Sequence, residues 1–287
     1  FPIMEKIGLV LEGGASRGVF TAGVLDYWME QGITFPYVVG VSAGACNAAD
    51  LVSKQIGRTR NTMIHKDKKY EYMGLRTFFK TRQLMDMDLI FRTFPEEYFP
   101  FDYDTYFASE TEVEYGCTDC HTGRPVFLSE KQDKDRLMDI LRASCAMPGA
   151  VRPVLVDGKP YVDGGLSDSI PVKRAFEMGC DKVVVIQTRG RNFRMKPSRS
   201  TKLIARAYGR YPAIGEDLRR RPVRYNKNLA YIRRMEQAGK VLAIRPCMPE
   251  VGRMEKDYKK LMTFYRHGYI LAQEQFAQLQ GFMGGKR

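Results

Sequence analysis

Short apolar runs, each about the length of one strand, recur along the chain. They lie at residues 7–11, 37–39, 182–188 and 241–244. The run at 182–188 is continuously apolar from Val183 to Ile186, which is typical of a strand covered on both faces in a parallel sheet. Apolar residues at helical spacing extend from Val19 to about Gln31, between the first two runs. Strand, helix and strand in succession predict an α/β fold, with a mainly parallel central sheet in a three-layer α/β/α arrangement.

Paired runs and helix boundaries extend this order of elements. Two hairpins are expected where apolar runs flank turn residues, at 112–115 with 125–128 and at 151–156 with 160–162. A helix is expected from near Pro171 to Gly179, because proline favours a helix start and glycine a helix end. Apolar positions at helical spacing predict a final helix from about Glu255 to Gln280.

Composition indicates one globular unit. The 287 residues are 44% hydrophobic and 28% charged, which is ordinary for a soluble domain with one sizeable core. No apolar run approaches the roughly 20 residues of a membrane span, and no leader-like segment precedes the first strand. Six cysteines agree with a reducing compartment. We therefore expect a cytoplasmic protein that is at most peripheral to a membrane.

The positive charge is concentrated in one segment. Residues 189–234 hold fifteen Lys and Arg against two acids, and the rest of the chain is neutral although the total is +13. Four of these bases recur at helical spacing: Arg199, Lys202, Arg206 and Arg210. A basic amphipathic helix can lie on an anionic membrane, or it can be the solvated flank of a helix packed on the core, and both interpretations stay open. Nucleic acid is disfavoured as a partner because no nucleic-acid motif accompanies the segment.

The candidate chemistry begins with a pentapeptide, Gly40-Val41-Ser42-Ala43-Gly44. It directly follows an apolar run and precedes a string of small residues. This context predicts a strand, a sharp turn and a helix, an arrangement that holds a serine hydroxyl exposed on a strained backbone. Sterics explain why positions 40 and 44 are glycine, because side chains there would collide where the strand and helix backbones pass closely. Ser42 is therefore the candidate nucleophile.

A glycine-rich loop, Glu12 to Gly18, lies between the first strand and the first helix. A loop of this kind at a helix N-terminus offers unpaired N–H groups and positive potential to an anion. A dinucleotide fingerprint would need glycine in place of Ala15, and a Walker A loop would need Lys and Ser/Thr where the chain has Arg17-Gly18-Val19. The remaining use is an oxyanion hole, whose N–H groups face a tetrahedral intermediate.

A third element, Asp163-Gly164-Gly165, follows the second predicted hairpin. Taken alone, it favours an ordinary turn. A serine nucleophile needs an adjacent base, however, and the three histidines lie in settings that do not suggest catalysis: His65, His121 and His267. An aspartate that acts directly as the base is therefore favoured over a hidden Ser-His-Asp triad.

In residue identity and order, the three elements resemble the patatin-like phospholipases over roughly residues 7–190. The stretches 221–226 and 245–268 also resemble a bacterial subgroup of that family with a C-terminal extension. The resemblance implies a lipid acyl-ester hydrolase with a dyad of Ser42 as nucleophile and Asp163 as general base, without a metal or an organic cofactor.

The resemblance also implies roles for the flanking residues. Gly13, Gly14 and Ala15 would form the oxyanion hole, and Arg17 would meet a headgroup phosphate. The motif glycines are Gly18, Gly40, Gly44, Gly164 and Gly165. One departure from the family pattern is Ala15, which replaces the usual glycine. A left-handed backbone there would cost on the order of 1–2 kcal/mol with a Cβ present, so either the loop is reshaped or this position does not require positive φ.

The resemblance suggests a division into a catalytic core at 1–190 and a basic C-terminal extension at 191–287, packed on the same domain. Residues 57–110 would be a helical insertion. Several apolar residues follow one another there in quick succession: Met85, Met87, Leu89, Ile90, Phe91, Phe94 and Phe99. Helices that cover the sheet are favoured for this segment, and the alternative is a lid or an acyl-chain pocket, which flexible Met and aromatic side chains would suit.

Alternatives to a phospholipase A or lysophospholipase remain. The same dyad serves a thioesterase or an acyltransferase, and the basic 189–234 stretch could belong to a non-catalytic protein that binds anionic lipid or nucleic acid. The sequence Cys117-Thr118-Asp119-Cys120-His121 formally matches a haem-attachment motif and half of a zinc site. The two strand-like runs that bracket it favour an ordinary hairpin instead.

Overall fold

The computed structural model describes residues 5–284, and within them eight strands form a single sheet with the order β5-β6-β3-β2-β1-β7-β8, while β4 pairs with β3. The strands are β1 (Ile7–Leu11), β2 (Tyr37–Val41), β3 (Glu112–Asp119), β4 (Pro125–Leu128), β5 (Val154–Val156), β6 (Lys159–Asp163), β7 (Lys182–Ile186) and β8 (Val241–Ile244). The four pairings from β3 through β2, β1 and β7 to β8 are parallel, and those among β3, β4, β5 and β6 are antiparallel. The predicted mainly parallel sheet is confirmed.

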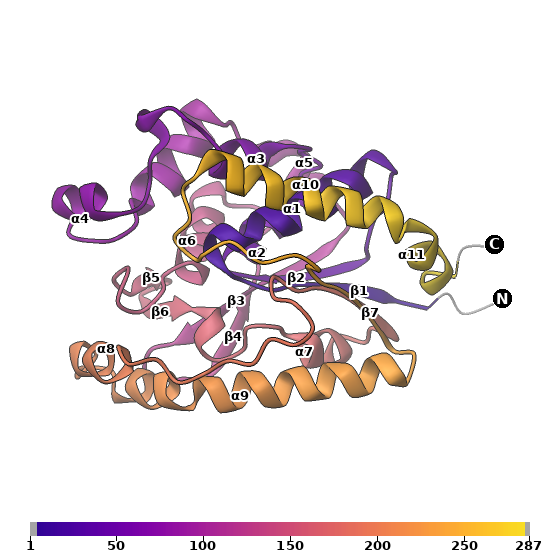
Figure 1. Cartoon of the computed structure of the whole chain (residues 1–287). Coiled ribbons are helices and arrows are strands. Elements are labelled where there is room, and N and C mark those ends of the chain that lie inside the picture. Colours follow the sequence, from indigo (N-terminus) through magenta and orange to yellow (C-terminus); the bar gives the residue numbers. More distant parts are fainter. Residues whose placement is uncertain (1–4, 285–287) are drawn as a thin grey trace.

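Helices cover both faces of this sheet (Figure 1). The α-helices are α1 (Gly18–Glu30), α2 (Ala43–Val52), α3 (Arg58–Met63), α4 (Leu75–Thr81), α5 (Tyr103–Ala108), α6 (Lys134–Ser144), α7 (Val172–Glu177), α8 (Thr201–Ala207), α9 (Pro212–Gln237), α10 (Tyr258–Glu274) and α11 (Phe276–Phe282). Short 3-10 turns lie at η1 (Ala15–Arg17), η2 (Lys68–Tyr70) and η4 (Gly164–Leu166), and η3 (Leu89–Tyr98) has π-helical hydrogen bonding.

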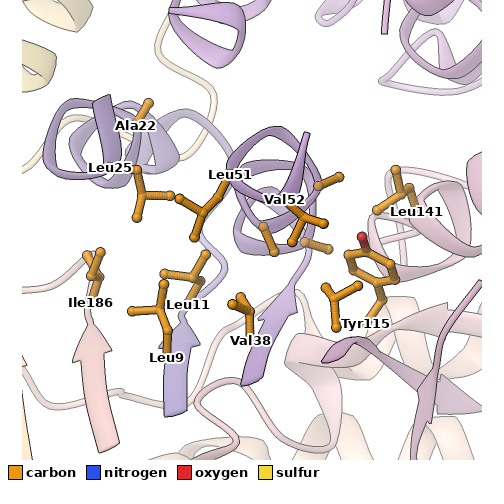
Figure 2. Packing of buried hydrophobic residues seen from close by; sticks show 14 of the residues in the cluster. Leu9, Leu11, Ala22, Leu25, Val38, Leu51, Val52, Tyr115, Leu141 and Ile186 are labelled. Carbon is orange, nitrogen blue, oxygen red and sulfur yellow. The ribbon is translucent and has the colours of Figure 1, made fainter. Parts of the chain in front are cut away.

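Side chains along the central strands point alternately to the two faces of the sheet, so a hydrophobic core lies on each face. Leu9 and Leu11 of β1 point, with Val38 of β2, toward Leu25 of α1 and Leu51 of α2 (Figure 2). All five side chains are buried. Because successive side chains on a strand face opposite ways, the intervening residues of these strands must enter the layer on the other side.

That second layer holds Val10 of β1 and Val183 of β7, which pack with Tyr225 and Ile232 of α9. The long α9 runs beneath the sheet in Figure 1, beside α7. Burial on both faces explains why the 182–188 run is apolar at successive positions rather than at alternate ones.

The C-terminal third contributes to the same sheet, because β8 pairs with β7 and α10 lies along α1 (Figure 1). The two helices approach closely at glycines. A Cβ added at Gly23 would lie 2.0 Å from the carbonyl oxygen of Tyr265, and one at Gly268 would lie 2.1 Å from that of Phe20. The predicted single helix at 255–280 is wrong in its bounds. Asp257 caps α10 by accepting the Lys260 N–H at 2.9 Å, and the chain leaves helical geometry at Gln275 before α11.

The basic repeat in the 189–234 stretch does not form one helix. Helix α8 spans only Thr201–Ala207, so Arg199 precedes it and Arg210 follows it. The chain turns through Gly209 and enters α9 at Pro212, a residue that favours a helix start. All four basic residues of the repeat are exposed. Their contact with an anionic membrane stays a prediction. In the described part of the chain, no helix combines the length and apolarity needed to cross a membrane.

The segment 57–110 packs against the main body. Met87 and Phe91 are buried in the main core, and the helices of the segment pack mainly on α1, α2 and α6. In contrast, Leu75 and Phe79 on α4 are 72% and 73% exposed, and α4 projects from the body in Figure 1. Movement of this segment as a lid stays a prediction.

Candidate active site

Ser42 lies at the junction of β2 and α2, at the carboxyl end of the parallel strands. Its backbone has φ 57° and ψ −124°, a region that non-glycine residues rarely adopt and that costs on the order of 1–3 kcal/mol. The flanking glycines permit this turn. A Cβ on Gly40 would lie 2.3 Å from the Gly44 carbonyl oxygen, and a Cβ on Gly44 would lie 2.3 Å from that of Leu11. The pentapeptide therefore forms the strained turn that its sequence predicts.

Ser144 supports this turn from the end of α6. Its Oγ accepts the N–H of Ser42 at 2.9 Å and donates to the carbonyl oxygen of Gly116 at 2.6 Å. The hydroxyl thus ties the strained residue to the neighbouring strand β3. Sequence reasoning missed Ser144, because an isolated serine near a helix end carries no signal of such a contact.

Asp163 ends β6 and is 6% exposed. Strand register brings it near Ser42: Val41 pairs with Gly116 on β3, and the next β3 residue, Cys117, pairs with Asp163. The Asp163 Oδ1 accepts the N–H of Gly165 at 2.7 Å. The two residues of the predicted dyad therefore lie near each other across β3, although they are far apart in the sequence.

Burial raises the pKa of the Asp163 carboxyl, and four favourable contacts partly offset this rise. They are the nearby Ser42 side chain, the Gly165 N–H, and the positive charges of Arg221 and Arg253. A raised pKa makes a carboxylate a stronger base. The geometry therefore suits proton transfer from Ser42 to Asp163.

The loop at Gly13, Gly14 and Ala15 lies against the nucleophile. A Cβ on Gly13 would lie 2.9 Å from the Cβ of Ser42, so only glycine allows the backbone this close. Within residues 5–284, none of the three N–H groups donates a hydrogen bond to another protein group. Unpaired backbone donors beside a nucleophile form an arrangement that can stabilise an oxyanion.

Ala15 adopts φ 49°, so this position is left-handed, and the loop holds an alanine where glycine would fit without strain. We expect Ala15→Gly to raise the free energy of unfolding by about 0.5–1 kcal/mol, because relief of the Cβ strain exceeds the added entropy of the unfolded chain. Urea unfolding checks this. Lys54→Gly, at an exposed left-handed residue with φ 56°, is the matched control. A loss of stability in Ala15→Gly alone would contradict the strain interpretation.

Arg17 lies under this loop and is 6% exposed. Its Nε is buried without a hydrogen-bond partner among the described residues. Burial, followed by the nearby charges of Arg189 and Arg253, lowers the pKa of Arg17 to about 10. It remains a cation at neutral pH and lines the same cavity as Ser42.

Two cavities meet at the nucleophile, one lined by many charged side chains and one almost wholly apolar, and both are lined by Ala15, Ser42 and Met147. The polar cavity has a volume of about 720 Å³ and also holds Asp163. Among the described residues, its basic side chains are Arg17, Arg189, Arg194, Lys196, Arg221 and Arg253. The apolar cavity has a volume of about 80 Å³.

Residues 57–110 supply most of the apolar wall. The side chains that they contribute to it are Thr59, Thr62, Met63, Tyr72, Met73, Met85, Ile90, Phe91 and Phe94. The segment therefore packs on the helices of the main body and also borders a cavity at Ser42. Cys46 and Cys145 also line the cavity, with their sulfur atoms 3.8 Å apart.

Glu12 anchors the base of the oxyanion loop to the C-terminal portion. It is 3% exposed, and its carboxyl accepts hydrogen bonds from the Tyr225 hydroxyl of α9 and, at 2.7 Å, from the Thr188 N–H. The Thr188 hydroxyl in turn donates to the Gly13 carbonyl oxygen at 2.9 Å. Burial raises the pKa of Glu12, and these contacts oppose the rise.

The histidines lie elsewhere, and neither cavity at Ser42 is lined by any of the three. His65 is half-buried. His121 is exposed in the turn after β3, and the Nε2 of His267 accepts the Cys247 N–H at 3.0 Å. Cys117 is buried on β3, and no cluster of three or more metal-ligating side chains lies among residues 5–284.

The chain matches the family model described as patatin-like phospholipase over residues 9–176, and a model described as a domain of unknown function (DUF6363) over residues 211–284. Uncharacterized protein YjjU of Escherichia coli (strain K12) is 35% identical over 189 residues, which are 64% of this chain and 52% of YjjU. Lysophospholipase nte1 of Aspergillus oryzae is 25% identical over 191 residues, which are 63% of this chain and 12% of that protein. The chain thus aligns with about half the length of YjjU and a small part of nte1.

Among solved structures, VipD from Legionella pneumophila superposes with a TM-score of 0.51 at 13% identity, over 96% of this chain and 67% of VipD. At this identity the similarity concerns the fold alone. The family match covers more than half of the chain and includes both the Ser42 turn and Asp163. The chain belongs to the patatin-like phospholipase family.

Proposed function

We propose that this protein is a serine hydrolase of lipid acyl esters, with Ser42 as nucleophile and Asp163 as general base. One observation carries the proposal: Ser42 stands where an apolar cavity meets a cationic one, beside a buried carboxylate and three unpaired N–H groups. A phospholipid has the same division, since its ester carbonyl separates an acyl chain from a phosphate headgroup. Lysophospholipases among the relatives support this substrate class.

In the first half of the reaction, the Ser42 hydroxyl gives its proton to Asp163 as its oxygen bonds to the acyl carbonyl carbon. The carbonyl oxygen becomes an oxyanion, which the N–H groups of Gly13, Gly14 and Ala15 stabilise. The bond between that carbon and the ester oxygen then breaks. Asp163 returns the proton to the leaving oxygen, so an alcohol departs and an acyl-Ser42 ester remains.

In the second half, water replaces the alcohol. Asp163 takes a proton from the water as its oxygen attacks the acyl carbon, and the same loop stabilises the second oxyanion. The bond to the Ser42 oxygen breaks, Asp163 returns the proton to that oxygen, and a fatty acid leaves. The dyad thus carries out both steps with groups that the fold already holds.

The test is a hydrolysis assay with three substrates: a diacyl phospholipid, the matching lysophospholipid and p-nitrophenyl butyrate. We expect fatty acid release from at least one of the two lipids in addition to p-nitrophenol release. Turnover of an acyl thioester alone would assign a thioesterase instead. Acyl transfer to an added alcohol that exceeds release of free acid would assign an acyltransferase.

The pH dependence follows from Asp163. Because its pKa is raised and only the carboxylate acts as a base, kcat/KM should rise with pH through an ionisation above the ordinary aspartate value of about 4. Arg253→Gln removes a cation that favours the carboxylate, so this rise should move to higher pH. The pH profile of p-nitrophenyl butyrate hydrolysis measures both effects. A shift to lower pH in Arg253→Gln would contradict the assignment.

A further inference from the structure

The polar cavity has a cationic wall that comes largely from outside the segment matched by the patatin-like family model. Arg17 belongs to that segment, but Arg189, Arg221 and Arg253 lie beyond residue 176. Arg221 is on α9, and Arg253 is in the segment between β8 and α10. The C-terminal portion therefore brings two guanidinium groups close enough to Asp163 to influence its pKa.

Arg189 is paired with Glu250 at 3.6 Å, but the other three guanidinium groups have few protein acceptors. The Nε of Arg17 has none among the described residues, and an Nη of Arg253 contacts only the sulfur of Met147, at 3.0 Å. Thioether sulfur is a weak acceptor. Arg221 donates its Nε to the Gly165 carbonyl oxygen at 2.7 Å, a contact that uses one of its five donors. Most of the donor capacity therefore remains for a ligand.

The acids of the cavity do not balance this charge. Among the described residues that line it, the carboxyl groups are Glu12 and Asp163, and Glu12 is already held by Tyr225 and Thr188. Burial lowers the pKa of Arg253, and repulsion from Arg221 lowers it further. Partly desolvated cations that repel one another favour an anionic ligand.

A cationic headgroup finds no partner here. Quaternary ammonium groups are usually bound by aromatic faces, and the aromatic residues on this wall of the described structure are Phe193 and Tyr225. The guanidinium of Arg189 already lies 4.2 Å from the ring centroid of Phe193. The ring of Tyr225 is buried, and its hydroxyl is held by Glu12.

We propose that the polar cavity selects phospholipids with a net negative headgroup over zwitterionic ones, and that Arg253 and Arg221 determine this specificity. The inference rests on the proposed hydrolysis at Ser42. With the ester carbonyl at Ser42, the phosphate lies on the arginine side of the nucleophile. A glycerol headgroup leaves the phosphate charge intact, whereas choline brings a cation against the same arginines.

The test compares kcat/KM for phosphatidylglycerol and phosphatidylcholine with identical short acyl chains, both below their critical micelle concentrations. Monomeric lipids remove any effect of membrane surface charge. The variants are Arg253→Gln, Arg253→Lys and the control Arg220→Gln. Arg220 is the neighbour of Arg221 on α9, but it is 70% exposed, pairs with Glu216 and lies outside this cavity. The ratio of the two kcat/KM values cancels changes common to both lipids, including any change in the pKa of Asp163.

We expect the wild type to prefer phosphatidylglycerol by about tenfold or more, the size of one charge-assisted hydrogen bond. Arg253→Gln should lower this ratio by about tenfold, Arg253→Lys should restore part of it, and Arg220→Gln should keep it. Equal use of both lipids by the wild type, an unchanged ratio in Arg253→Gln, or turnover of p-nitrophenyl butyrate alone would overturn the inference. Because reaction of Ser42 with a fluorophosphonate is measured in parallel, its absence together with no turnover of any substrate would instead overturn the proposed function, and the inference with it.

Discussion

Ser42→Ala is expected to lower kcat for ester hydrolysis by about 10⁴-fold or more, because it removes the only atom that forms the acyl-enzyme bond. The serine hydroxyl occupies the strained turn at the meeting point of both cavities. The thiols of Cys46 and Cys145 line the apolar cavity nearby. The hydrogen bond between Cys145 and Cys46, followed by burial, raises the pKa of Cys145, so this thiol is not expected to replace the missing hydroxyl.

The measurement is intact-mass analysis after reaction with a fluorophosphonate, alongside turnover of p-nitrophenyl butyrate. Wild type should gain one adduct, and Ser42→Ala should gain none. Ser129→Ala, which alters an exposed serine after β4, is the matched control and should label like wild type. An adduct that persists in Ser42→Ala would place the nucleophile elsewhere. Absence of labelling in folded wild type, with lipid present, would favour a binding protein that acts through its basic stretch.

Asp163→Asn is expected to lower kcat by a similar factor, about 10⁴-fold, because an amide cannot accept the serine proton. The fold should tolerate the change. The amide oxygen can still accept the Gly165 N–H, and the variant removes a carboxyl whose charged form is disfavoured by burial. Since the two residues act as one unit, the Ser42→Ala/Asp163→Asn double variant should be scarcely slower than either single one.

Asp168→Asn is the control for this prediction. Asp168 is a second aspartate on the same segment, with a pKa raised to about 6 by burial, but it does not line either cavity at Ser42. Its variant should keep wild-type kcat, and urea unfolding should show that both variants are folded. Near-wild-type turnover in Asp163→Asn would exclude the dyad and reopen the search for a histidine.

The sequence predicted those features whose causes are local. Successive apolar side chains were enough to predict β1, β2 and β7 as strands buried on both faces. Glycines at positions where a Cβ would collide with the backbone were enough to predict the turn at Ser42. The left-handed backbone of Ala15 could not be predicted in this way. A single alanine at that position does not reveal whether its loop is strained or reshaped.

Local sequence patterns did not predict the interactions between distant segments. Helical spacing of the bases from Arg199 to Arg210 predicted one helix, but the chain turns at Gly209 and starts α9 at Pro212 because Tyr208 and Ile214 are buried in a small cluster of their own. The sequence likewise gave no sign that Ser144 would hold the Ser42 backbone. Its position depends on how α6 packs beside β3.

By itself, then, the sequence determined the fold class and the three motifs, since each motif meets a steric or chemical need within a few residues of chain. Only the tertiary structure decided what surrounds them. Strand register across β3 brings Asp163 to Ser42, the segment 57–110 supplies the apolar wall, and α9 with the β8–α10 segment brings Arg221 and Arg253 to the other side. These groups are separated by tens to hundreds of residues, and their proximity arises from packing of the whole chain, which no local pattern records.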